Sequence, residues 1–237
     1  MIPCYVGYDP REAICYHVFC QSVIEHSSSP VSFTPLYTKM LANFDGQQDG
    51  TNAFVYSRYL IPYLNGYSGW ALFVDGDMVV LTDLAELWAL RDDKYACMVV
   101  KHDYKTRHAW KYIGTPLTNS NLDYPRKNWS SVVLWNCGHQ SNRILSRNFV
   151  AEAGGQALHR FSWLRDEEIG DIPKEWNNLV LEYDNKNAKL LHHTLGTPAF
   201  KHYSDSDPNF HRYLLKTIHA EGENPEDIVR RANGVRS

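Results

Sequence analysis

The sequence predicts an α/β fold with a mostly parallel central sheet flanked by helices. The chain opens as strand, helix and strand, over residues 3–8, 11–26 and 31–37. Such a βαβ unit is typical of a parallel sheet. Later segments, including 70–74 and 131–136, are almost continuously apolar, which suits strands that are covered on both faces.

The later elements are expected in the following order. Thr51 or Asn52 caps a helix that Pro62 stops. Residues 105–127 have no clear period, and we expect a loop region that shapes an acceptor site. The other expected elements are helical segments over 83–90 and 142–153, strands over 95–100 and 188–191, and a helical stretch over 209–220.

Composition and charge narrow the class of protein. The formal net charge of −3 argues against a nucleic-acid partner, which would call for a basic patch. The five cysteines are odd in number and form no C-x-x-C pair, which favours reduced thiols over a disulfide framework or a zinc site. No signal sequence or membrane-spanning stretch is visible, so we expect a cytoplasmic protein with at most peripheral membrane association. We expect residues 1–237 to form a single domain, with a mostly helical C-terminal tail from about residue 204.

The stretch Asp75-Gly76-Asp77 is the strongest candidate for chemistry. It follows the apolar run 70–74, and the carboxyl edge of a parallel sheet is where ligands bind. Gly76 allows the backbone to bend so that both carboxylates converge on one cation, and such hard oxygen ligands suit Mg²⁺ or Mn²⁺. Asp-Gly between two apolar runs is also a strong hairpin signal, and this stretch alone does not separate the two readings.

Other candidate residues are ambiguous when taken singly. Tyr8 and Asp9 follow the first strand and could stack on and hydrogen-bond a base, or Asp9 could simply initiate the next helix. Arg58 could be an ordinary surface arginine. The acidic run 166–168 is of a kind that usually forms a solvated face.

Taken together, these stretches resemble the GT-A glycosyltransferases, and most closely family 8, the group of glycogenin and the bacterial lipopolysaccharide galactosyltransferases. Asp75-Gly76-Asp77 matches the Asp-x-Asp motif of that fold. Residues 51–62 resemble the family's helix motif through Tyr56, Arg58 and Pro62. His193 and Gly196 match the late His-x-x-Gly motif, and residues 131–136 and 166–168 have counterparts as well. The resemblance covers residues 2 to about 203.

The resemblance implies a GT-A fold, which is a Rossmann-like nucleotide-diphospho-sugar transferase fold. It also implies a metal-dependent, retaining transfer of a sugar from a nucleoside-diphosphate sugar, with a UDP-sugar favoured, to a hydroxyl of a glycan, glycolipid or protein. The implied ligands of Mn²⁺, with Mg²⁺ as the other possibility, are Asp75, Asp77 and His193. The implied nucleotide and donor contacts are Tyr8, Asp9, Tyr56, Arg58, Asp75, Gly76, Asp77, Gly196 and Lys201. The implied catalytic residues are Asp166, Glu167 and Arg58.

Two departures from the family pattern limit what is carried over. The family lysine falls at Ala199, and Lys201 or Lys101 could take its place. Trp129 stands where the family has an asparagine that contacts the donor sugar, so the donor sugar is not carried over. Front-face attack and a covalent intermediate on Glu167 both stay open. A sugar nucleotidyltransferase and a non-catalytic carbohydrate-binding protein are the alternative functions.

Overall fold

The structure is a computed structural model that describes residues 1–41, 44, 52–183 and 185–219. The predicted capping residue Thr51 and the end of the C-terminal tail lie outside this part of the chain. Within it, no helix is long and apolar enough to cross a membrane. All five cysteines are free thiols.

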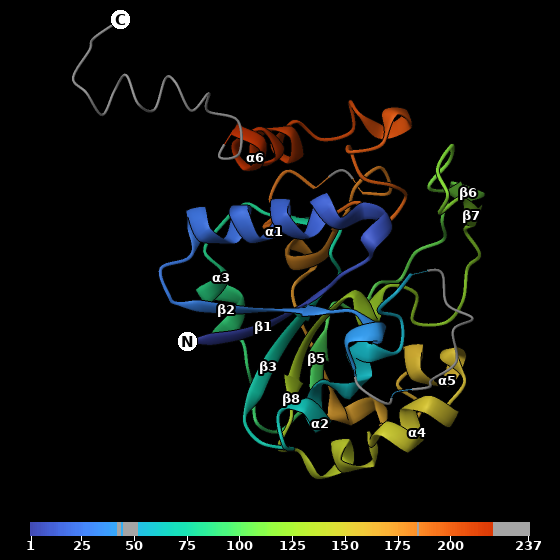
Figure 1. Ribbon diagram of the computed structural model, residues 1–237. Coiled ribbons are helices and arrows are strands. Elements are labelled where there is room, and N and C mark those ends of the chain that lie inside the picture. The colour runs from blue at the N-terminus through green and yellow to red at the C-terminus, as the bar shows by residue number, and fades with distance from the viewer. Residues whose placement is uncertain (42–43, 45–51, 184, 220–237) are drawn as a thin grey trace, which may run out of the picture.

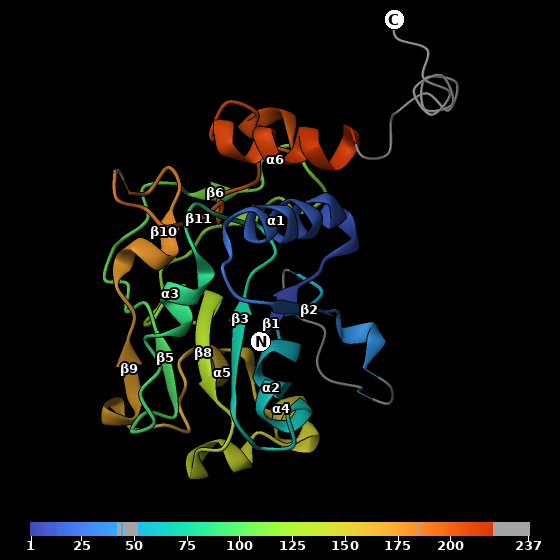
Figure 2. The same ribbon diagram turned by 90° about the vertical axis from the view of Figure 1, so that its left-hand side faces the viewer.

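A six-stranded sheet forms the centre of the molecule (Figure 2). Its strand order is β2-β1-β3-β8-β5-β9. Strand β8 runs antiparallel to its neighbours β3 and β5, while β1–β2, β1–β3 and β5–β9 are parallel pairs. The predicted mostly parallel sheet is therefore confirmed. The strands are β1 Ile2–Gly7, β2 Val31–Leu36, β3 Trp70–Val74, β5 Cys97–Val99, β8 Val132–Asn136 and β9 Ile169–Asp171.

Helices cover both faces of this sheet (Figure 1). Strand β3 shows why both faces need cover, because Ala71 and Phe73 enter one apolar core while Leu72 and Val74 enter the other. One face carries α1 Ala13–His26 and α3 Leu84–Trp88, and the other carries α2 Ile61–Leu64, α4 Arg147–Glu152 and α5 Gly155–His159. Helix α6 Pro208–His219 lies against the outer side of α1, where Phe210 and Tyr213 pack near Cys15 and Val18.

A second, three-stranded sheet lies next to the loop that contains Asp75 and Asp77. It consists of β4 Met78–Val80, β11 Leu190–His192 and β10 Asn178–Leu179. Strands β11 and β4 are antiparallel, and His192 pairs with Met78. This register places the end of β11 beside the residue that follows Asp77.

Short elements complete the chain. Strands β6 Trp110–Lys111 and β7 Asn119–Ser120 form an antiparallel pair, so the predicted loop region 105–127 contains a small hairpin. The 3₁₀ turns are η1 Pro10–Glu12, η2 Thr38–Met40, η3 Ser57–Leu60, η4 Trp129–Ser131, η5 Gln140–Ile144, η6 Asp166–Glu168, η7 Lys174–Asn177 and η8 Lys201–Tyr203.

Two predicted helices differ from the structure. The helix expected to stop at Pro62 is instead the 3₁₀ turn η3 followed by α2, and Pro62 lies inside the first turn of α2, where its missing N–H costs nothing. The helix expected over 142–153 is divided into η5 and α4. The division occurs because Ser146 caps α4, with its Oγ accepting the N–H of Phe149 at 3.2 Å.

Candidate active site

The loop Asp75–Asp77 connects β3 to β4 at the carboxyl ends of β1 and β3. The N–H of Asp75 donates to the carbonyl oxygen of Ser131 at 2.9 Å, which fixes the loop to the start of β8. A Cβ atom on Gly76 would lie 2.2 Å from the carbonyl oxygen of Gly7, the last residue of β1. Because backbone cannot move aside cheaply, glycine is required here. The tight turn at Gly76 therefore positions the carboxylates of Asp75 and Asp77.

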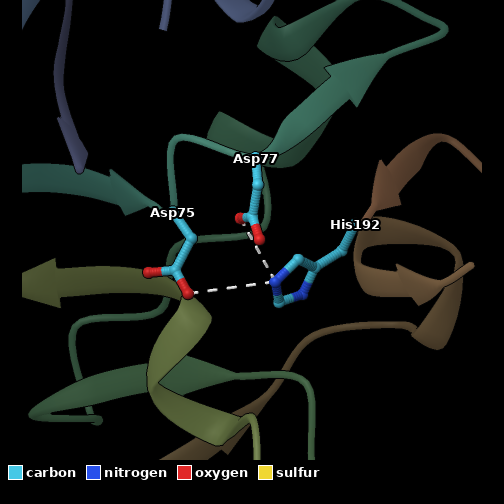
Figure 3. A group of neighbouring side chains, drawn as sticks. All are labelled: Asp75, Asp77 and His192. Atoms are coloured by element: carbon cyan, nitrogen blue, oxygen red, sulfur yellow. Dashed lines mark ion pairs between the residues drawn. The ribbon is translucent and has the colours of Figure 1, made fainter. Parts of the chain in front are cut away.

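His192 brings an imidazole to these carboxylates from the second sheet (Figure 3). Its Nε2 lies 3.4 Å from Oδ1 of Asp77 and 3.9 Å from Oδ2 of Asp75. One possible metal-ligand atom from each of the three residues lies within 4.8 Å of the other two. On the far side of the ring, Nδ1 is 2.9 Å from Oδ1 of Asn177, an oxygen that only accepts. Nδ1 therefore donates, and Nε2 is the nitrogen that faces the carboxylates.

Arg58 holds Asp75 from the opposite side. Its Nη1 lies 2.8 Å from Oδ1 of Asp75 and donates to the carbonyl oxygen of Ser130 at 2.9 Å. The buried guanidinium lies over the rings of Phe54 and Phe73, at 5.1 and 4.8 Å from their centroids. Burial raises the pKa of Asp75 to about 6, although Arg58 opposes that rise.

Asp77 is buried and only partly hydrogen-bonded. The hydroxyl of Tyr112 donates to its Oδ2 at 2.9 Å. Burial alone would raise the pKa of Asp77, but the charge of His192 and the hydrogen bond from Tyr112 outweigh burial and lower it. Its Oδ1 is buried without a well-aligned hydrogen bond. A buried, ionised oxygen of this kind needs a positive partner.

These residues line a cleft. Glu12 also lines it, and burial together with the charges of Asp77, Asp9 and Asp75 raises the pKa of the Glu12 carboxyl well above its usual range. Lys111 from β6 lines the same cleft. The cleft thus collects acidic and basic groups around a polar space.

The predicted histidine, His193, and its neighbour His192 face different groups in the structure. His193, which the family motif pointed to, does not face the carboxylate side chains of Asp75 and Asp77. Its Nε2 lies 3.0 Å from Oδ2 of Asp207, and its Nδ1 lies 3.0 Å from the backbone oxygen of Asp77. Neighbouring residues on a strand point to opposite sides, and the register of β11 with β4 directs His192, not His193, into the cleft.

The predicted catalytic acids Asp166 and Glu167 do not line the cleft. Their side chains are 85% and 66% exposed, and each forms an ion pair, Asp166 with Arg126 and Glu167 with Arg165. Both belong to η6, which precedes β9. In the structure both acids are exposed and paired with arginines, and their expected place beside the reacting sugar stays a prediction.

Neither lysine that was expected to replace the family lysine reaches the cleft. Nζ of Lys101 lies 3.3 Å from Oδ1 of Asp171. Lys201 is exposed and lines cavities beside Ile113 and His202. The predicted donor contact of Lys201 is therefore not supported by its position.

The other predicted nucleotide and donor residues lie around the cleft rather than in it. Both carboxylate oxygens of Asp9 are occupied, by Arg11 and by the N–H of Ala53, so Asp9 caps η1. Tyr8 packs edge-on against Tyr16. Tyr56 and Asp9 line an adjoining cavity. Gly196 has a φ of 144°, and a Cβ there would collide with the ring of Tyr203, so its role is conformational.

The titratable residues of the cleft that the sequence did not single out include Glu12, Lys111, Tyr112 and His192. For His192 a signal was present, because the period-2 pattern puts it on the same face as buried Leu190. The sequence carries no such signal for Lys111 and Tyr112, because a two-residue strand in an irregular segment has no recognisable period.

Comparison with known proteins identifies the family. The model of glycosyl transferase family 8 matches residues 12–155, more than half of the chain. Protein CDI of Arabidopsis thaliana is 45% identical over 215 residues, which cover 86% of this chain and 81% of that protein.

Solved structures agree on the fold. The galactosyltransferase LgtC, in complex with donor and acceptor sugar analogues, superposes with a TM-score of 0.57 at 12% identity, over 91% of this chain and 96% of LgtC. The bifunctional glycosyltransferase WbbM gives a TM-score of 0.61 at 14% identity, over 90% of this chain but only 49% of WbbM, so this chain spans about half the length of that protein. The fold is GT-A and the protein is a glycosyltransferase. The chain belongs to glycosyl transferase family 8.

Proposed function

We propose that the protein is a divalent-metal-dependent transferase that takes a sugar from a nucleoside-diphosphate sugar, with UDP-sugars favoured, and passes it to a hydroxyl of a glycan, glycolipid or protein. The observation that carries this proposal is the convergence of Asp75, Asp77 and His192 at the carboxyl edge of the sheet. Residues 1–237 would form one catalytic domain.

The side chains present fit a divalent ion. Oδ1 of Asp77 is buried without a well-aligned hydrogen bond, and Nε2 of His192 points at it. Two carboxylates and one imidazole suit Mn²⁺ better than Mg²⁺, because nitrogen is a ligand that Mn²⁺ accepts more readily. Asp75, Asp77 and His192 would hold the ion, which would supply positive charge to the departing diphosphate.

The protein's own groups account for the remaining steps. Arg58 is fixed by Asp75 and Ser130, so its guanidinium needs no reorganisation to stabilise negative charge that develops beside it. The bond between the sugar and the diphosphate oxygen breaks, and a bond from the acceptor oxygen to the same carbon forms. The proton of the acceptor hydroxyl passes to the departing phosphate.

The position of Glu167 favours front-face attack in this proposal. A covalent route needs a carboxylate within bonding reach of the sugar carbon. Glu167 is exposed and paired with Arg165, outside the cleft. We therefore propose retention of configuration without an enzyme-bound sugar.

A thermal-shift screen tests the proposal. Each UDP-sugar is added to the wild-type protein with Mn²⁺ and, separately, with EDTA. A productive donor should raise the melting temperature only with Mn²⁺. A ligand that binds the native state and not the unfolded state stabilises the native state. Asp77→Asn should abolish that shift. Asp171→Asn, which changes an exposed acid that pairs with Lys101, is the matched control and should keep it. A wild-type shift that is equally large in EDTA would contradict the metal-dependent site.

A further inference from the structure

We infer that Lys111 is a second cation, beside Arg58, that binds the diphosphate of the donor, so that the β6–β7 hairpin supplies a phosphate-binding group to the cleft. The inference rests on the proposed function. It concerns a residue outside the stretches that match the family motifs.

Of the two positively charged side chains in the cleft, Lys111 is the one that has no ion pair with the described residues. Arg58 and Lys111 are the arginine and lysine among the described residues that line it. Arg58 is already engaged with Asp75 and the carbonyl oxygen of Ser130. The ammonium of Lys111, in contrast, makes no ion pair or side-chain hydrogen bond within residues that the structure describes. Lysine is a compact cation with three donors, suited to phosphate oxygens.

The hairpin holds Lys111 at a fixed place relative to the metal-ligand residues. Lys111 pairs with Asn119 of β7, which also lines the cleft. The next residue, Tyr112, donates its N–H to the carbonyl oxygen of Leu195 at 2.6 Å and its hydroxyl to Oδ2 of Asp77. Tyr112 has a φ of 55°, a conformation that non-glycine residues adopt only where surrounding contacts enforce it. The backbone that carries Lys111 is therefore fixed before any ligand binds.

Charge balance supports the assignment. Two carboxylates would neutralise a divalent ion, so the metal centre alone leaves a diphosphate largely uncompensated. Burial lowers the pKa of Lys111, only partly offset by the charge of Asp77. Lys111 is half-buried and makes no ion pair with the described residues, so an anionic ligand would offset part of the free energy that its burial costs.

The test compares UDP with uridine in the presence of Mn²⁺, by isothermal titration of the full chain. Lys111→Met removes the charge at similar volume. It should weaken UDP binding by about 10- to 100-fold, because that change in affinity corresponds to the free energy of one charge-assisted hydrogen bond. Uridine binding should stay unchanged. Lys111→Arg should keep UDP affinity within a few-fold of wild type. Lys105→Met, at an exposed lysine outside the cleft, is the matched control and should bind both ligands as wild type does.

A second readout separates binding from folding. Because Lys111 makes no ion pair with the described residues and its burial disfavours the charge, Lys111→Met should melt at the wild-type temperature or above it. Undiminished UDP affinity in Lys111→Met would overturn the inference, and so would an equal loss of UDP and uridine binding. Failure of the wild-type protein to bind UDP would instead count against the proposed donor class, and the role of Lys111 would fall with it.

Discussion

His192 and His193 are adjacent, yet their rings meet different groups. Nε2 of His192 faces Asp75 and Asp77, whereas both ring nitrogens of His193 face oxygens, on Asp207 and on the backbone of Asp77. Asp207 also accepts the N–H of Asn209 at 2.8 Å in the first turn of α6. His193 therefore connects α6 to the Asp75–Asp77 loop, while His192 belongs to the cleft.

Substitution should separate these two roles. His192→Ala removes an imidazole ligand, so we expect Mn²⁺ affinity to fall at least about tenfold with little change in melting temperature. His193→Ala leaves the buried Asp207 without its partner, so we expect the free energy of unfolding to fall by about 3 kcal/mol. Titration of both variants with Mn²⁺ measures the affinity, and chemical denaturation measures the free energy of unfolding. The reverse pattern, with His193 governing affinity, would restore the ligand that the family motif indicated.

At the level of elements, the site depends on how closely the β3–β4 turn approaches the end of β1. The close contact between Gly76 and the carbonyl oxygen of Gly7 fixes that approach. The same turn directs both carboxylates toward β11, whose register brings His192 into place.

Gly76→Ala tests this arrangement. The added methyl would collide with backbone, so we expect a loss of about 1–3 kcal/mol in the free energy of unfolding and weaker Mn²⁺ binding. Gly138→Ala is the matched control, because the nearest atom to its Cβ would be 3.7 Å away, an ordinary contact. Equal stability of the two variants in urea denaturation would show that the turn tolerates a side chain.

Elements with a clear pattern were predictable from sequence, and elements set by tertiary contacts were not. Strand β3 is apolar throughout because both its faces are covered, so its unbroken apolar run reveals it. The antiparallel direction of β8 carries no sequence signal. Motif order pointed to Asp75, Asp77 and Arg58, which the structure places together, but the choice between His192 and His193 depends on strand register. Nothing in the acidic run itself reveals that Asp166 and Glu167 form ion pairs with Arg126 and Arg165.

At the scale of the whole molecule, buried titratable groups link stability to pH. Burial lowers the pKa of His102 and of His159 to about 3. In the unfolded chain these histidines titrate near 6.5, so between about pH 6.5 and pH 3 the unfolded state binds more protons than the native state. Each histidine therefore removes stability as the pH falls through this window.

His102→Phe should reduce that loss. The ring of His102 stacks on Tyr183 at 5.8 Å between centroids, and phenylalanine preserves the stacking without a titratable group. We expect the stability of the variant relative to wild type to rise by up to about 1.4 kcal/mol per pH unit as the pH falls below 6.5. Denaturant unfolding at pH 7, 6 and 5 measures the difference, and a difference that is constant with pH would contradict a neutral, buried His102.

The central claim is that Asp75, Asp77 and His192 hold a divalent ion that binds a nucleoside diphosphate. Anomalous diffraction at the manganese edge, from crystals grown with Mn²⁺ and UDP, tests it most directly. We expect one strong peak at about 2.0–2.3 Å from a carboxylate oxygen of each aspartate and from Nε2 of His192, a range ordinary for divalent metal ligands. A peak at His193 and Asp207, or density for UDP in this cleft without any metal peak, would contradict the account.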